Sequence, residues 1–354
     1  MTEQRTANVV GLGLIGGSIA AALRARGWRV SGVDDNPATT ASAIDRAVID
    51  AVGIERDASI TFVAVPVSRG IEAVRSALAS TTGIVTDVGS VKGPICEATT
   101  DPRFVGGHPM AGSERDGLDG ADPNLFEGAI WVLTPDGDAD DVVFAQLTAI
   151  LAGLGAEVVG IDPQRHDEVV AVVSHVPHLA AASLMGLAAD RSIEHAALLR
   201  LAAGGFRDMT RVASGRADIW LDICEANRAA IVDALSHLID DLAEVRTAID
   251  AGRREELRER LDRARDARAN LPSRIVHPEN MAEVRIPIPD RTGSAAEVFV
   301  LAADLSVNIA SFEVVHVAER NLGVAVVLVD QAHADVFRGG LIARGFRPSV
   351  QALT

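Results

Sequence analysis

A glycine-rich segment near the N-terminus has the spacing of a nucleotide-binding turn. It comprises Gly11-Leu12-Gly13-Leu14-Ile15-Gly16 and lies between an apolar run and a helical run. In such a turn the first glycine permits the tight bend, and the second lets backbone N–H groups approach a pyrophosphate at the helix N-terminus. The spacing therefore predicts that this segment binds a dinucleotide.

A carboxylate beyond this turn indicates which dinucleotide is bound. An expected strand at Arg29–Val33 is followed by Asp34, about 20 residues after the turn, where a carboxylate can accept hydrogen bonds from both ribose hydroxyls. The same charge repels the 2′-phosphate of NADP, so the pattern favours NAD as the cofactor. The neighbouring Asp35 and Asn36 leave the identity of the ribose partner open.

Two loop segments carry further candidate side chains. Asp87–Lys92, which includes Ser90, directly follows a β-type run, and α/β sheets present ligand-binding groups at the carboxyl ends of their strands. Gly106–Glu114 places His108 before Pro109, which restricts the histidine to extended backbone. The small and rigid neighbours of His108 leave room for a ligand.

A long uncharged segment, Val169–Ala189, brings polar side chains together at helical spacing. Ser174 and His178 are four residues apart, so they share one helix face. Pro177 removes a backbone donor, so the helix should bend or begin there. His175 and His178 have no third ligand at the spacing of a metal site, so we expect no metal and a core position for His175. Polar groups are costly in lipid, so we expect this segment in a protein core and not across a membrane.

The segment Gly204–Arg211 brings two arginines, Arg207 and Arg211, to a flexible turn. A guanidinium forms forked hydrogen bonds with a carboxylate. Arg211 is therefore a candidate for holding an acidic substrate.

The composition limits the classes of partner. Lys+Arg 33 against Asp+Glu 49 gives a net charge of −16, which repels phosphate backbones and anionic lipid and argues against nucleic-acid binding. Hydrophobic residues make up 48% of the chain, enough for a buried core. The two cysteines, Cys96 and Cys224, are too few for a disulfide framework, so we expect free thiols in a cytoplasmic protein.

The sequence pattern predicts three domains. Residues 1–161 alternate β-type and helical runs, which predicts a doubly wound α/β sheet of the Rossmann type. Residues 162–272 carry apolar residues at helical spacing, which predicts an all-helical domain ending in a solvated helix at Arg253–Arg268. Residues 280–354 alternate again and predict a small α+β domain. The expected strands of the first domain are Asn8–Gly11, Arg29–Val33, Ile60–Val65, Ile84–Thr86, Ile130–Leu133 and Glu157–Val159. In the tail we expect strands at Glu283–Pro287, Phe312–Ala318 and Gly323–Val329, and helices at Ser294–Asp304 and Ala334–Arg344.

Together these motifs resemble those of the prephenate dehydrogenase family. The matching segments are Gly11–Ser18, Asp87–Lys92, Gly107–Glu114, Ser174–His178 and Phe206–Arg211. The family has a Rossmann domain followed by a helical dimerisation domain. The resemblance therefore implies a homodimer that uses NAD for the oxidative decarboxylation of prephenate to 4-hydroxyphenylpyruvate, a step of tyrosine biosynthesis.

The resemblance also implies a role for each matching side chain. His108 would be the catalytic histidine that accepts the proton of the ring 4-hydroxyl, a task suited to a neutral imidazole with a pKa of about 6.5. Ser90 would hold that hydroxyl, and Arg211 would bind a substrate carboxylate. The other implied pocket residues are Ser174, His178, the gating acidic pair Glu114 and Asp208, and Trp220, which would be lent by the partner subunit.

The tail resembles an ACT regulatory domain over Ile286–Ile309, through a strand, the turn Pro289–Gly293 and a helix. ACT domains are βαββαβ units that pair and bind amino acids at the paired surface. The resemblance implies control by an aromatic amino acid, with tyrosine as the first candidate effector.

Three alternatives stay open at this point. Arogenate differs from prephenate only by an amino group in place of the keto oxygen, and the sequence does not choose between them. Another NAD-linked dehydrogenase, acting on a 3-hydroxy acid, would usually use a helix lysine as acid, and Val169–Ala189 contains none. The third is a non-catalytic sensor of NAD or of an amino acid.

Overall fold

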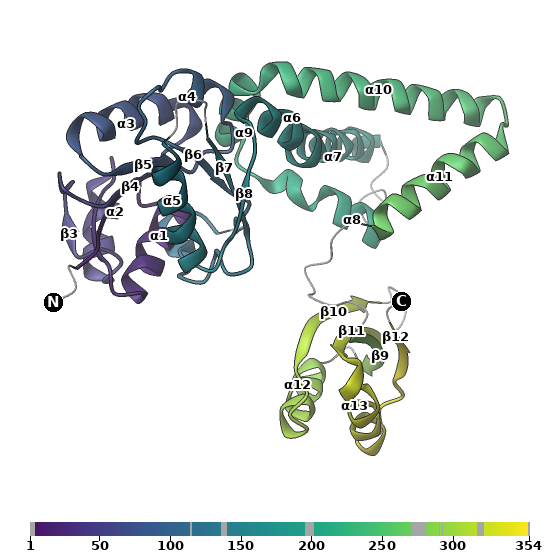
Figure 1. Cartoon of the computed structure of the whole chain (residues 1–354). Helices are drawn as coiled ribbons and strands as arrows, with labels where there is room; N and C mark the ends of the chain where they lie inside the picture. Colours follow the sequence, from purple (N-terminus) through teal and green to yellow (C-terminus); the bar gives the residue numbers. More distant parts are fainter. Residues whose placement is uncertain are drawn as a thin grey trace. The chain divides into compact units, whose positions relative to one another are not determined.

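The computed structural model describes residues 4–113, 115–135, 140–194, 202–270, 280–289, 291, 293–316 and 322–352. The chain divides into two compact units, Met1–Thr247 and Ala248–Thr354. Each unit is described by itself, and Figure 1 labels its elements.

The first unit begins with a five-stranded parallel sheet. Its strands are β1 (Thr6–Val10), β2 (Arg29–Val33), β3 (Ala51–Val52), β4 (Ile60–Val63) and β5 (Ile84–Asp87), in the order β3-β2-β1-β4-β5. The helices that accompany them are α1 (Leu14–Ala25), α2 (Pro37–Asp45), α3 (Val67–Ser80) and α4 (Gly93–Glu97). Strands β4 and β5 are buried along their whole length, as expected when a parallel sheet is covered on both faces. The strand order reverses between β1 and β4, where sheets of this type bind ligands.

A three-stranded sheet extends this scaffold. Strand β6 (Gly106–Pro109) is antiparallel to β7 (Ile130–Thr134), which is parallel to β8 (Glu157–Gly160). A short 3-10 turn (Gly117–Gly120) and helix α5 (Asp141–Gly153) complete this region. A parallel bridge between Val85 and Phe104 leads from β5 into β6. The chain before β6 is thereby attached to β5, an edge strand of the main sheet.

Helices form the rest of the first unit. Helix α6 (Pro163–Val170) passes through a π turn (Ala171–His175) into α7 (Val176–Glu194). Then come α8 (Gly204–Thr210), a 3-10 turn (Arg211–Ser214), α9 (Ala217–Ala226) and α10 (Arg228–Asp250). Helices α7 and α10 lie side by side (Figure 1). Residues of both helices line one groove.

The geometry around Pro177 agrees with the sequence prediction. Proline cannot donate the backbone hydrogen bond that continues an α-helix. The structure accommodates it with a π turn that ends at His175, and Pro177 is the second residue of α7. The expected bend or start of a helix at this proline is therefore confirmed.

One helical stretch among the described residues, Pro163–Arg191, is long and apolar enough to cross a membrane by length and composition. His166, Asp167 and His175 lie on it, are buried and form hydrogen bonds. Paired polar groups of this kind are typical of a helix packed inside protein.

The second unit contains a charged helix and a four-stranded antiparallel sheet. Helix α11 (Arg254–Ala269) has no buried residue, so the predicted solvated helix is confirmed. Its other elements, in chain order, are β9 (Met281–Pro289), α12 (Ser294–Asp304), β10 (Ile309–His316), β11 (Leu322–Asp330), α13 (Gln331–Ala343) and β12 (Ser349–Ala352). The sheet order is β10-β11-β9-β12. Residues of the strands and of α12 and α13 form one buried core, which includes Val284, Ile286, Val298, Leu301, Val327, Phe337 and Leu341. The order βαββαβ is the one that the resemblance of the tail implied.

The sequence prediction missed three strands, and most of its strand bounds differ from the structure by a few residues. Strands β3, β6 and β12 were not expected by range. Strand β6 has the sequence Gly-Gly-His-Pro, which lacks the β-branched residues that mark strands. The expected strand end at Ala318 and the link at Leu271-Pro272 lie outside the described residues.

Candidate active site

The glycine turn leaves open space at the N-terminus of α1. Gly11 has a φ of +88°, and a Cβ there would lie 2.3 Å from the carbonyl oxygen of Ala64. A Cβ on Gly16 would lie 1.9 Å from the carbonyl oxygen of Gly11, whereas a Cβ on Gly13 would meet nothing within 4 Å. No side chain caps α1, so its first backbone N–H groups are directed to open space, as a pyrophosphate requires. These residues fit NAD.

Asp34 stands beside this turn at the carboxyl end of β2. Its Oδ2 accepts a hydrogen bond from the backbone N–H of Leu12 at 2.8 Å, and its Oδ1 accepts one from Asn36 at 2.9 Å. Each carboxylate oxygen has a second lone pair for a ribose hydroxyl. Asp35 instead forms an ion pair with Arg69 on α3, which favours Asp34 as the ribose ligand.

Two histidines from different elements meet at the centre of the site. Nδ1 of His108, on β6, lies 2.9 Å from Nε2 of His166, on α6. The two rings meet edge to face with centroids 5.1 Å apart. Nδ1 of His166 is in turn 2.8 Å from Oδ1 of Asp167. Strand β6 thus places His108 against a buried and hydrogen-bonded His–Asp pair.

The surroundings of His108 favour its neutral form. Burial lowers the pKa of His108 well below its ordinary value, and the nearby His166, Lys92 and His175 lower this pKa further. A neutral imidazole has a lone pair that can accept a proton at neutral pH. The site therefore contains a histidine in the form that a general base requires.

A buried ion pair joins Lys92 to Asp87 at the carboxyl end of β5. The side chain of Lys92 is fully buried and that of Asp87 nearly so. Asp87 also accepts a hydrogen bond from the backbone N–H of Gly107 at 3.2 Å. A buried charge is tolerated when it is paired in this way. The pair fixes the loop that carries Ser90 against the strand that carries His108.

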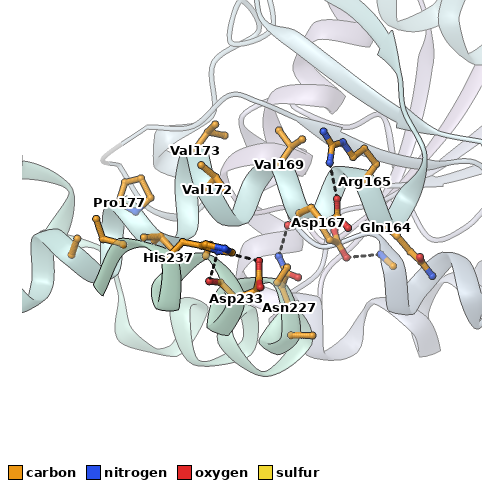
Figure 2. A pocket seen from close by; sticks show the side chains of 18 of the residues that line it. Gln164, Arg165, Asp167, Val169, Val172, Val173, Pro177, Asn227, Asp233 and His237 are labelled. Carbon is orange, nitrogen blue, oxygen red and sulfur yellow. Dashed lines mark hydrogen bonds and ion pairs between the residues drawn. The ribbon is translucent and has the colours of Figure 1, made fainter. Parts of the chain in front are cut away.

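Asp167 connects the same loop to the helices. Its Oδ1 accepts a hydrogen bond from the backbone N–H of Lys92 at 2.8 Å, and its Oδ2 accepts one from Gly93 at 2.7 Å. The side chain of Asn227 donates to the carbonyl oxygen of Asp167 at 2.8 Å. Figure 2 shows Asp167 and Asn227 facing each other between their helices. The carboxylate thereby holds α4 and α6 at one point.

His175 is a core histidine, as the sequence predicted. It is buried, and its Nδ1 lies 3.2 Å from Nδ2 of Asn227. Burial lowers the pKa of His175 to about 4, while Asp167 raises it and His166 lowers it to smaller extents. Within the described residues no group of three or more His, Cys, Asp and Glu side chains is placed to hold a metal ion.

His178 and Trp220 stack on each other within the same chain. Their ring centroids are 3.5 Å apart and the ring planes differ by 11°. Trp220 packs against a small cluster that includes Val91 and Ala171. Trp220 therefore lies beside the chain's own His178, and the expectation that the partner subunit also receives this tryptophan stays a prediction. Burial lowers the pKa of His178, which favours the neutral ring that stacks.

The remaining candidates occupy more open positions. Ser90 and Ser174 are half-buried, whereas Asp208 and Arg211 are exposed on α8 and on the 3-10 turn that follows it. This 3-10 turn packs against α7, the helix that carries His178. Glu114 lies outside the described residues.

The sequence analysis did not single out His166, Asp167 or Asn227. A signal was present for the first two. They are ionisable residues on a helix that starts at Asp162-Pro163, a favourable cap, and that continues into an uncharged segment. Asn227 carries no such signal, since its partners are 52 and 60 residues away in sequence.

Replacing Asp34 tests cofactor selection. Asp34→Ser should weaken NAD binding and relieve the exclusion of NADP, because it removes the charge that repels a 2′-phosphate. Asp34→Asn is the matched control: it keeps an oxygen that can accept from Leu12 but removes the charge. The measurement is the ratio of kcat/KM for NAD and NADP. Equal use of both cofactors by the unmutated protein would contradict the role of Asp34.

Comparison with known proteins identifies the family of the chain. Residues 19–160 match the family model described as "Prephenate dehydrogenase, nucleotide-binding domain", and residues 162–263 match "Prephenate dehydrogenase, dimerization domain". A prephenate dehydrogenase of Bacillus subtilis (strain 168) is 32% identical over 329 residues, which cover 88% of this chain and 88% of the relative.

Solved structures agree as well. Prephenate dehydrogenase from A. aeolicus, in complex with hydroxyphenyl propionate and NAD+, has a TM-score of 0.71 at 30% identity, covering 75% of this chain and 98% of that one. Arogenate dehydrogenase from Synechocystis has a TM-score of 0.67 at 34% identity, covering 74% of this chain and 98% of that one. The chain belongs to the prephenate dehydrogenase family and is an NAD-dependent oxidoreductase.

Proposed function

We propose that this protein oxidises prephenate with NAD and releases CO2 to form 4-hydroxyphenylpyruvate, a step of tyrosine biosynthesis. The observation that carries the proposal is His108, a half-buried histidine whose pKa is lowered and which is hydrogen-bonded to His166. NAD, when bound at the glycine turn, accepts a hydride from the ring carbon that bears the hydroxyl. The histidine supplies the complementary half of the reaction, removal of the hydroxyl proton.

His108 accepts that proton as the hydride leaves. Loss of both converts the ring alcohol into a ketone, which makes the ring a vinylogous β-keto acid. Its carboxylate then departs as CO2, and formation of the aromatic ring drives the reaction forward. Ser90, in the loop after β5, holds the hydroxyl beside His108.

Residues of the helical part bind the charged groups of the substrate. Prephenate is a dianion, and the protein has a net charge of −16, so local cations must hold it. Arg211 binds one carboxylate through a forked pair of hydrogen bonds. Ser174 and His178 line the pocket, and Glu114 and Asp208 gate it.

The direct test is NADH formation by the purified protein with NAD and either prephenate or arogenate. Arogenate is the near alternative, and a similar structure is that of an arogenate dehydrogenase. Turnover of prephenate with the higher kcat/KM supports the proposal. Preference for arogenate would reassign the substrate, turnover of a 3-hydroxy acid alone would reassign the reaction, and binding of NAD without turnover would indicate a sensor.

We infer that the protein acts as a homodimer through its helical part. Helices α6, α7 and α10 border a groove of 1240 Å³ lined by Val169, Val172, Val173, Pro177, Ala234 and Leu238 (Figure 2). Val172 and Val173 are each 60% exposed, and such exposed apolar patches mark interaction surfaces. The groove lies within the residues that match the dimerization-domain model. A second copy of the chain is therefore its occupant.

The domain boundaries follow the same division. We place the NAD-binding domain at residues 1–161, the helical domain at 162–272 and an ACT-like domain at 280–354. The ACT-like assignment is supported by the βαββαβ order of the tail. Cys96 and Cys224, both among the described residues, form no disulfide, which suits a cytoplasmic enzyme.

His108→Asn tests the base. The variant should lose about 10²–10⁴ in kcat while binding substrate nearly as well, because a general base acts mainly in the transition state. In the unmutated enzyme kcat/KM should fall only as the pH drops below 6.5, since the pKa of His108 is lowered and the base works unprotonated. An unchanged kcat in the variant would remove His108 from the mechanism.

Arg211→Ala tests carboxylate binding. The KM for prephenate should rise by about 10–100-fold, because a charge-assisted hydrogen bond is worth about 1.5–3 kcal/mol. The KM of Arg211→Lys should lie between the values of the unmutated enzyme and of Arg211→Ala, because lysine keeps the charge but cannot form the forked pair of hydrogen bonds. Arg216→Ala, at an exposed arginine paired with Asp218, is the control and should leave KM unchanged. An effect of Arg211→Ala on kcat alone would contradict this role.

Tyrosine titration tests the tail. NADH formation by the whole chain should be inhibited by tyrosine, whereas residues 1–280 should retain activity and lose the inhibition. An effector acts only if it binds two states unequally, and pairing of two tails in a dimer provides such states. A whole chain insensitive to tyrosine, phenylalanine and tryptophan would reduce the tail to an assembly module. Inhibition retained by residues 1–280 would place the effector in the active site.

A further inference from the structure

We propose that His166 and Asp167 are positioning residues that fix the tautomer of His108, so that its Nε2 carries the lone pair that accepts the substrate proton. The three side chains form a line of two hydrogen bonds, from His108 Nδ1 to His166 Nε2 at 2.9 Å and from His166 Nδ1 to Asp167 Oδ1 at 2.8 Å. The direction of each bond follows from Asp167.

Both oxygens of Asp167 act as acceptors. Oδ1 accepts from the backbone N–H of Lys92 at 2.8 Å, and Oδ2 accepts from that of Gly93 at 2.7 Å. A backbone N–H can only donate, so the carboxylate oxygens face donors on both sides. The third neighbour of Asp167, Nδ1 of His166, must therefore carry a hydrogen and donate it.

The position of the hydrogen on His166 determines the tautomer of His108. A neutral His166 that carries its hydrogen on Nδ1 has a lone pair on Nε2. That lone pair faces Nδ1 of His108, so Nδ1 of His108 carries the hydrogen and donates it. The remaining ring nitrogen of His108, Nε2, is then the acceptor, whichever way the isolated imidazole would prefer to be protonated.

The same line stabilises the product of the proton transfer. When Nε2 of His108 takes the hydroxyl proton, the ring becomes an imidazolium that keeps its hydrogen on Nδ1. The acceptor on His166 and the carboxylate behind it then face a positive charge, and such charge-assisted hydrogen bonds are stronger than neutral ones. No atom of His166 or Asp167 needs to change its protonation.

The surrounding structure is shaped to hold this line. A Cβ on Gly93 would lie 2.9 Å from Oδ2 of Asp167, so the carboxylate approaches this backbone more closely than another residue would allow. The side chain of Asn227 holds the carbonyl oxygen of Asp167 at 2.8 Å. His108 and His166 are 58 residues apart in sequence and are brought together by β6 and α6.

Two substitutions at His166 separate its two hydrogen bonds. The amide of a glutamine reaches the place of Nε2, so His166→Gln keeps an acceptor for His108. The amide of an asparagine reaches the place of Nδ1, so His166→Asn keeps the contact with Asp167 and loses the one with His108. This part of the inference rests on the proposed function, because it is read from turnover of prephenate.

We expect His166→Asn to lower kcat about 10²-fold or more with little change in KM, since a catalytic histidine with the wrong tautomer can lose about 10⁴ in rate. His166→Gln should keep kcat within about tenfold of the unmutated enzyme. Thermal unfolding of both variants shows whether either has lost its fold. Equal kcat in the two folded variants would overturn the positioning role.

A second measurement needs neither substrate nor a variant at His166. In the NAD-bound enzyme at neutral pH, 15N NMR of the histidine rings should show His108 with a protonated Nδ1 and an unprotonated Nε2, its signals assigned by their loss in His108→Asn. A hydrogen on Nε2 would overturn the inference, whatever the enzyme turns over. The tautomer found as expected in a protein that does not oxidise prephenate would refute the proposed function and leave the positioning intact.

Discussion

The site depends on one buried carboxylate, that of Asp167. It accepts hydrogen bonds from the backbone of Lys92 and Gly93 and contacts the ring of His166, so it joins the loop after β5 to helix α6. A buried donor that loses its acceptor costs about 1–3 kcal/mol, and three donors converge here. The geometry around His108 on β6 is therefore set by a helix that belongs to a different part of the chain. The helical part is therefore a structural component of the proposed catalytic centre and does more than cover it.

The buried ion pair does not explain how an acidic protein can accept an anionic substrate. Lys92 is fully buried, but it forms an ion pair with Asp87. The two charges cancel, so the pair adds no net attraction for an anion. The proposed cation for the dianion, Arg211, instead lies in a more open position, on the exposed turn after α8. A guanidinium in an exposed position avoids the cost of burying a charge.

Features that depend on local chemistry were predictable from the sequence. The glycine turn and the start of a helix at Pro177 each follow from the backbone properties of one or two residue types. Strand β6 was not predicted, because Gly-Gly-His-Pro has no intrinsic preference for a strand and pairs only because β7 provides a neighbour. The line from His108 to Asp167 was also missed, since it joins residues 58 positions apart. The spacing motifs singled out His108, the proposed base, but only the fold shows its contact with His166.

If His108 is the base, as we propose, loss of hydration gives it both its suitability and its main difficulty. Removal from water lowers its pKa, so the ring is neutral at physiological pH and ready to accept, yet the same shift makes it a weaker base. A weak base cannot remove the proton of an ordinary alcohol, whose acidity is far too low. The hydroxyl becomes acidic only as the hydride departs from the same carbon, because the oxygen then acquires the character of a protonated ketone. Proton and hydride must therefore leave together, and the base needs accurate placement more than strength. A histidine fixed on a strand, with its far nitrogen held by His166, meets that requirement.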